Sequence, residues 1–172
     1  WGRLRESKSG AKRASILLVT KCPKNLSKTA RQEISKRINP LPNQSVFFTS
    51  IAYHKKLLNR QKEKALASLS SSFFLITGIA NPEPLVKFLK EEGKIFEHLN
   101  YPNHHEFKPE EIKEIKKRKQ AQTIVTTEKD FGRLESYFSS EELFYLPITM
   151  EFLEEKEAKE FKTLVASSII KN

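Results

Sequence analysis

The chain has 172 residues, of which 38% are hydrophobic and 30% are charged, a composition that excludes a disordered protein and suits one globular domain with a sizeable core. Lysine and arginine total 31 against 21 acidic residues, and the resulting net charge of +10 indicates either anionic partners or simply a solvated basic face. The single cysteine, Cys22, excludes an internal disulfide, and no apolar run approaches the ~20 residues that a transmembrane helix needs.

Residues 1–13 are polar and basic, and they predict a connector or a short helix. The first residue is Trp1 and the only methionine is Met150, so we expect the chain to be a piece of a longer protein. An active site that draws on that longer protein would be only partly present in these residues.

Four further predictions cover residues 14–72. The apolar run 16–20 is typical of a buried strand, and residues 46–53 predict a second strand. Between them, apolar residues recur every four positions, as on one face of a helix, at Leu26, Ala30, Ile34 and Ile38. Residues 55–72 are basic and serine-rich with no clear period, which predicts an exposed excursion from the fold.

The stretch 73–82 organises the rest of the chain. It opens with the continuous apolar run Phe73–Ile76, which predicts a strand buried on both faces. Gly78 permits a tight turn, Asn81 is suited to cap a helix, and Pro82 is suited to the first helical position. A strand, a turn and a helix in this order form the unit from which parallel α/β sheets are built.

The same alternation continues to the C-terminus. Gly93 ends the first helix, Pro109 opens another, and Thr127 with Asp130 has the form of a helix capping box. Short strands are expected at 94–99, 123–126 and 144–148, followed by a C-terminal helix. We therefore predict an α/β fold, a three-layer α/β/α sandwich with a mainly parallel sheet.

Polar side chains follow several of the predicted strands. Because the carboxyl ends of parallel strands share one edge, that edge is expected to hold two imidazoles and two lysines, which suit an anionic phosphate; its members are Lys21, Asn81, His104, His105, Glu128, Lys129 and Asp130. Thr127 and Asp130 also fit a purely capping role, and the lysines also fit an ordinary exposed surface. Adjacent histidines in an extended loop point opposite ways, so at most one of them is expected to face a site.

Several common signatures are missing. No G-x-x-x-x-G-K-[ST] phosphate loop, GxGxxG or GxSxG pattern occurs, and one cysteine without paired ligand spacing predicts no metal site. From the residues alone, the chain is a basic α/β domain with a candidate anion-binding edge.

Short motifs in a fixed order nevertheless resemble a known family. The motifs are Gly2-Arg3-Leu4-Arg5-Glu6, Arg13-Ala14 before a strand that ends in Thr20-Lys21, Gly78-Ile79-Ala80-Asn81-Pro82, Gly93, His104-His105-x-Phe107, and Thr126-Thr127-Glu128-Lys129-Asp130. Together they are similar to the C-terminal half of the tetraacyldisaccharide 4'-kinase family, the lipid A kinases of Gram-negative bacteria. The resemblance covers nearly the whole chain.

The resemblance implies a fold and an activity. Family members transfer the γ-phosphate of ATP, with Mg²⁺, to the 4'-hydroxyl of tetraacyldisaccharide 1-phosphate and form lipid IVA, at the cytoplasmic face of the bacterial inner membrane. Two α/β/α domains are implied, related to P-loop NTPases, and the N-terminal one carries the phosphate loop and the magnesium ligands. Residues 1–13 would then connect to that missing domain, and 14–172 would be the C-terminal domain, inactive alone because positioning and charge neutralisation dominate phosphoryl transfer.

The resemblance also implies roles for individual residues. Arg5 and Glu6 would lie at the domain junction near the nucleotide, and Lys129 and Asp130 would also contact the cofactor. His104 is the better candidate for supporting the reaction and His105 the weaker one. Gly78, Asn81 and Asn103 would line the edge of the cleft. The family usually has Asp where this chain has Asn103, and a neutral amide cannot act as a carboxylate base or a strong magnesium ligand.

Two alternatives remain open at this stage. The charge is compatible with a non-catalytic module that binds anions or nucleic acid, although no nucleic acid is expected, because basic residues with interleaved aromatics are not found. Under the kinase interpretation, two basic clusters are candidates for peripheral contact with anionic lipid, one at Lys55, Lys56, Arg60, Lys62 and Lys64 and one at 113–119.

Overall fold

The computed structural model describes residues 8–69 and 72–170, which divide into two compact units. One, the terminal unit, combines residues 8–52 with 149–170, and the other, the central unit, comprises residues 53–148. This division differs from the single domain expected over 14–172, because strands far apart in the sequence form a separate sheet in the terminal unit.

The terminal unit contains a sheet in the order β1-β2-β9, with β1 and β2 parallel and Ile16 opposite Ser45. Phe47 packs edge-on against Phe152 and Phe161, which joins β2 to β9 and α5. Its elements are η1 (Lys8–Arg13), β1 (Ile16–Val19), α1 (Lys28–Ile38), β2 (Ser45–Tyr53), β9 (Ile148–Phe152) and α5 (Glu155–Ile170). Within the described ranges, no helix is long and apolar enough to cross a bilayer.

The central unit is built on a sheet in the order β4-β3-β8-β7-β5-β6. Strands β8, β7, β5 and β6 are parallel, and β3 is antiparallel to both of its neighbours. The predicted α/β class with a mainly parallel sheet is therefore confirmed. The elements are β3 (Lys56–Leu58), β4 (Glu63–Ala65), η2 (Leu66–Ser68), β5 (Phe73–Thr77), α2 (Glu83–Glu91), β6 (Phe96–Asn100), α3 (Pro109–Lys119), β7 (Ile124–Thr127), α4 (Glu128–Leu134) and β8 (Leu143–Leu146).

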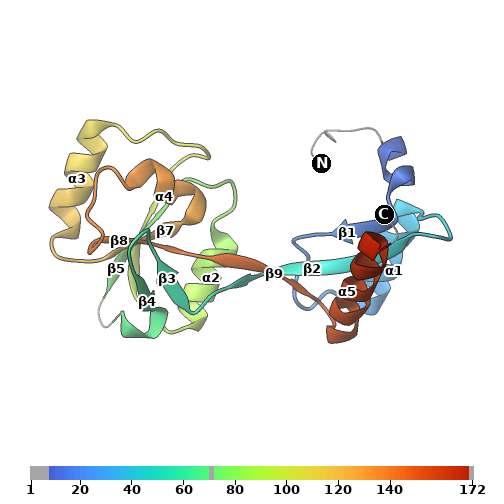
Figure 1. Cartoon of the computed structure of the whole chain (residues 1–172). Coiled ribbons are helices and arrows are strands. Elements are labelled where there is room, and N and C mark those ends of the chain that lie inside the picture. Colours follow the sequence, from blue (N-terminus) through green and yellow to red (C-terminus); the bar gives the residue numbers. More distant parts are fainter. Residues whose placement is uncertain (1–7, 70–71, 171–172) are drawn as a thin grey trace. The chain divides into compact units, whose positions relative to one another are not determined.

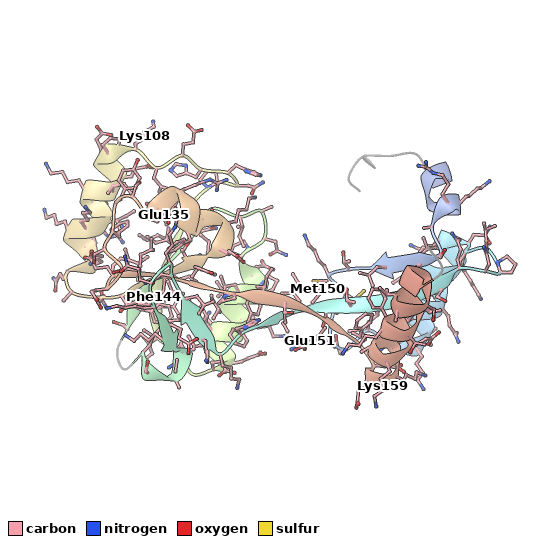
Figure 2. All side chains as sticks on the ribbon, viewed as in Figure 1. Lys108, Glu135, Phe144, Met150, Glu151 and Lys159 are labelled. Carbon is pink, nitrogen blue, oxygen red and sulfur yellow. The ribbon has the colours of Figure 1, made fainter. Side chains whose placement is uncertain are left out.

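Strand β5 separates two hydrophobic cores, and all five of its residues are buried, as its apolar run predicts. Phe73 and Leu75 face one core together with helix α2, whereas Phe74 and Ile76 face the other with α3 and α4. In Figure 1, α3 and α4 lie above the sheet of the central unit and α2 lies below it. Figure 2 shows the side chains that fill these layers, with the buried Phe144 labelled on β8.

The exposed excursion expected over 55–72 is wrong. This stretch contains the antiparallel pair β3 and β4, and three leucines enter the first core, at Leu57, Leu66 and Leu69. The strands are three residues long and rich in lysine, so no period of two is long enough to detect in the sequence.

An ion pair between a buried lysine and a partly exposed glutamate fixes the C-terminal end of α3. The Lys119 side chain is only 3% exposed, and its Nζ lies 2.6 Å from a carboxylate oxygen of Glu142, in the turn before β8. The hydrogen bond from this ammonium is the main cause that lowers the pKa of Glu142 to about 2. The pair therefore ties α3 to the sheet it covers.

The chain reverses its direction across the sheet between β5 and β7. It first moves outward from β5 to β6 through α2, and then returns over β5 through α3 to β7 and onward through α4 to β8. The connections after β5 and β7 therefore leave to opposite faces. In open α/β sheets, ligands bind beyond the carboxyl ends of the strands at such a reversal, which here places a candidate site beyond Thr77 and Thr127.

Candidate functional site

At this reversal, the end of β5 is joined directly to helix α4. The backbone N–H of Gly78 donates to Oδ2 of Asp130 over 2.8 Å, and Asp130 is fully buried. A Cβ on Gly78 would lie 3.2 Å from Oδ1 of Asp130 and 3.4 Å from the carbonyl oxygen of Pro102. The lack of a side chain at Gly78 therefore lets strand, helix and the following loop approach one another.

Asp130 has two further partners on its own helix. The hydroxyl of Thr127 accepts from the Asp130 backbone N–H over 3.1 Å, which confirms Thr127 as the N-cap of α4, and it donates to Oδ2 of Asp130 over 2.8 Å. The guanidinium of Arg133 lies 2.9 Å from Oδ1. All the partners of this buried carboxylate are thus N–H or O–H donors, as a buried charge requires.

His104 lies on the loop between β6 and α3, above the same point. Its backbone has φ +64°, a conformation that is uncommon for a residue other than glycine, and its N–H donates to the carbonyl of Gly78 over 3.0 Å. The exposed ring lies between two cationic side chains, with Nδ1 3.1 Å from Arg133 and Nε2 3.1 Å from Lys129. Strained backbone of this kind is often found at functional sites.

His105 has a different environment. Its Nε2 lies 2.9 Å from a carboxylate oxygen of Glu111, and its ring stacks on Tyr101 at 4.7 Å and meets Phe107 edge-on. A backbone hydrogen bond from Lys108 and the contact with His105 lower the pKa of Glu111. His105 therefore helps to hold the loop against α3, while His104 is exposed. The two rings have separate partners, but His104 lies in a turn with φ +64° and not in the extended loop that was expected.

The remaining predicted residues divide into three groups. Asn103 lies at the site, with Oδ1 3.4 Å from Lys129 Nζ. Asn81 was expected to cap α2, but the N-cap is Pro82, and Asn81 lies one residue before it, where its side chain accepts from the backbone N–H of Glu83 over 3.2 Å. The placement of Lys21 at the same edge is wrong, because β1 belongs to the sheet of the terminal unit. Glu128 is exposed and takes no part in the hydrogen bonds of Asp130 and His104 given above. Arg5 and Glu6 lie outside the residues that the structure describes.

Arg133 is the functional candidate that sequence reasoning missed. It follows Lys129 by four residues and Asp130 by three, so its side chain lies next to each of theirs along α4. This spacing was visible in the sequence and is the signal that identifies it. Gly78, His104, Lys129, Asp130 and Arg133 together are called the switch-point site below.

The charges of the switch-point site suit an anion rather than a metal ion. Asp130 is fully buried and held by donors, so it has no free oxygen to offer, whereas the ammonium of Lys129 is exposed beside the ring of His104. Over residues 8–69 and 72–170, no group of three or more His, Cys, Asp or Glu side chains is placed to hold a metal ion. The arrangement can neutralise negative charge and orient an oxygen-rich group through N–H donors.

A separate cavity of about 660 Å³ lies beside α2 and β6. His98 lines it, and the Nε2 atom of this ring lies 2.8 Å from the hydroxyl of the buried Thr77. Desolvation lowers the pKa of His98, so this ring is neutral over a wider pH range than an exposed one. None of the catalytic, cofactor-binding or cleft residues predicted from the sequence lines this cavity, although Pro82 does.

Comparison with known proteins gives a consistent result. The sequence profile of the family described as tetraacyldisaccharide-1-P 4'-kinase matches residues 1–168. A tetraacyldisaccharide 4'-kinase of Flavobacterium johnsoniae is 40% identical over 153 residues, covering 88% of this chain and 44% of the relative. The enzyme of that name from Flavobacterium psychrophilum is 41% identical over 172 residues, covering 97% and 50% respectively. The chain therefore spans about half the length of the curated relatives it matches.

A solved structure shares the fold. It is the "apo" form of LpxK from Aquifex aeolicus in complex with ATP, with a TM-score of 0.60 and 19% sequence identity. The match covers 96% of this chain and 46% of the other.

Proposed function

The chain belongs to the tetraacyldisaccharide-1-P 4'-kinase family, and from this premise we propose that it forms the C-terminal half of a kinase that phosphorylates a lipid A precursor. The reaction would transfer the γ-phosphoryl group of ATP to the 4'-hydroxyl of tetraacyldisaccharide 1-phosphate and yield lipid IVA. The observation that carries the proposal is the family match over residues 1–168, at 40% and 41% identity to kinases of that name.

The switch-point site would supply positive charge and N–H donors to this reaction. Phosphoryl transfer requires little covalent chemistry from the protein and depends on positioning and on stabilising the charge of the transferred group. Lys129 and His104 are exposed and lie together, so they suit contact with phosphoryl oxygens. Asn103 would accept a hydrogen bond from the Lys129 ammonium and would contribute no charge.

ATP fits the charges of this site, but Mg²⁺ does not. Magnesium prefers oxygen ligands such as carboxylates, and the carboxylate of the switch-point site is buried and accepts from Gly78, Thr127 and Arg133. No magnesium ligand is therefore assigned to the described residues. We propose that most nucleotide contacts come from the part of the relatives that this chain does not span.

Peripheral contact with the cytoplasmic face of an anionic inner membrane is also proposed, and the ion pairs favour one of the two basic clusters. Four members of the first cluster face carboxylates; the pairs are Lys55–Glu92, Lys56–Glu63, Arg60–Glu135 and Lys62–Glu141. On α3, Lys113, Lys116 and Lys117 are exposed, and Lys116 lies over the ring of Phe138. Among the described residues of that cluster, only Arg118 and Lys119 form ion pairs. An unpaired lysine near an anionic surface contributes about 1 kcal/mol.

A chimaera tests the proposed activity. This chain would replace the matching segment of the Flavobacterium johnsoniae kinase, and transfer of labelled phosphate from ATP to tetraacyldisaccharide 1-phosphate would be measured. We expect the chimaera to form the phosphorylated lipid, and the isolated 172-residue chain to form none, because the phosphate loop is absent from it.

Two outcomes decide the proposal. A folded chimaera without kinase activity would contradict it. Micromolar binding of ATP to the isolated chain would also contradict it, because the nucleotide site would then lie within this chain and not in the part of the relatives that it does not span. The variant Lys87→Met of the chimaera, at an exposed residue of α2, is the control, and we expect it to leave the rate of phosphate transfer unchanged.

A further inference from the structure

We propose that Asp130 and Arg133 are positioning residues that fix the tautomer of His104, so that its Nε2–H and the Lys129 ammonium converge on one anionic oxygen. The tautomer is a property of the chain itself, whereas the identity of the oxygen as a phosphoryl oxygen rests on the proposed function.

The first step is that Arg133 is held in place. Its NH1 group lies 2.9 Å from Oδ1 of Asp130, and Asp130 is fully buried, with its other oxygen accepting from Gly78 and Thr127. The guanidinium is planar, so fixing NH1 on this carboxylate also fixes the direction of NH2. The NH2 group lies 3.1 Å from Nδ1 of His104.

The second step follows from the donors. A guanidinium can only donate, so Nδ1 of His104 must accept, and in a neutral imidazole the proton is then on Nε2. The opposite tautomer would point an N–H at Arg133. Lys129 is exposed and flexible, whereas Arg133 is only 28% exposed and tied to a buried charge, so Arg133 rather than Lys129 decides the tautomer.

The third step concerns Nε2. Its N–H faces the Lys129 ammonium at 3.1 Å, and two donors cannot satisfy one another. An anionic oxygen beside the pair, about 2.8 Å from each nitrogen, would accept from both, and charge-assisted hydrogen bonds of this kind are about twice as strong as neutral ones. The backbone at His104, with φ +64°, and its N–H bond to Gly78 hold the ring in this position.

The tautomer is tested by NMR on the full 172-residue chain labelled with ¹⁵N at histidine. Long-range ¹H–¹⁵N spectra distinguish a protonated ring nitrogen from an unprotonated one. We expect the neutral His104 ring to carry its proton on Nε2, and Arg133→Met to produce a mixture of both tautomers. Arg118→Met, on α3, is the matched control and should leave the His104 signals unchanged.

The oxygen site is tested with inorganic phosphate as the probe. Phosphate should shift the Nε2 signal of His104 in the unmodified chain, and Lys129→Met should weaken this binding about tenfold, because one charge-assisted contact is lost. Lys87→Met is the control for general loss of charge. Asp130→Asn provides a second route to a released Arg133 if Arg133→Met does not fold.

The outcomes separate this inference from the proposed function. A proton on Nδ1 of His104, or an unchanged tautomer in both Arg133→Met and Asp130→Asn, would overturn the inference whatever the kinase assay shows. Equal phosphate binding by Lys129→Met and Lys87→Met would overturn the convergent site. The expected spectra together with an inactive chimaera would support the positioning role and reject only the kinase assignment.

Discussion

Replacing Asp130 with Ala tests how much the buried carboxylate of the switch-point site contributes to stability. The change removes the acceptor of the Gly78 N–H, of the Thr127 hydroxyl and of the Arg133 guanidinium. Hydrogen bonds to a charged group contribute about 1.5–3 kcal/mol each, but three losses do not add, because Arg133 is 28% exposed and can be hydrated. Since a buried N–H remains without an acceptor, we expect the free energy of unfolding to fall by about 3–5 kcal/mol.

Urea unfolding followed by the tyrosine near-ultraviolet circular dichroism is the suitable assay. All four tyrosines of the chain lie in the central unit, so in a Trp1→Phe background, where no indole band overlaps theirs, the signal reports this unit; they are Tyr53, Tyr101, Tyr137 and Tyr145. Glu128→Ala, an exposed position of the same helix, is the control and should change stability by less than about 0.5 kcal/mol. A loss below about 1 kcal/mol for Asp130→Ala, with an unchanged slope against urea, would refute the reasoning.

Three further predictions concern other parts of the central unit. Because Lys119 lowers the pKa of Glu142 to about 2, the stabilisation from this pair is complete above the ordinary pKa of 4.5 and is lost as pH falls toward 2. Glu142 is 38% exposed, so we expect the pair to contribute roughly 1 kcal/mol to the free energy of unfolding. The urea midpoints of the unmodified chain and of Glu142→Gln should therefore converge on acidification. Leu57→Ala should lower the free energy of unfolding by about 2–5 kcal/mol in the same urea assay, since this side chain is fully buried. An unchanged free energy of unfolding would instead support an exposed segment over 55–72. In the chimaera, His104→Ala should reduce turnover more than His105→Ala, whereas His105→Ala should lower the melting temperature more, and reversed rates would reject the assignment.

Features decided by short-range chemistry could be predicted from the sequence. The apolar run 73–76, the capping residues Thr127 and Asp130, and Pro109 at the start of α3 each specify their structure through neighbours a few positions away.

Features decided by long-range pairing could not be predicted in this way. A strand run such as 16–19 carries no signal for the sheet it joins, so β1 was assigned to the sheet of β5 although it pairs with β2 in the terminal unit. The charged strands β3 and β4 are too short for a period to emerge. At the site, Asp130 was recognised as a cap, but its bond to Gly78 spans 52 positions and depends on the β5–β7 register.

The two strands that connect the units have a consequence for how this protein can be rearranged. The central unit begins at Tyr53 and ends at Ile148, and next to these ends the backbone N–H of His54 donates to the carbonyl of Pro147 over 3.0 Å. Its two ends are therefore neighbours, and β2 and β9 are adjacent in the other sheet. A continuous gene segment coding for residues 53–148 could thus be gained, exchanged between relatives or moved to a new host protein in a single recombination event, carrying the whole switch-point site with it.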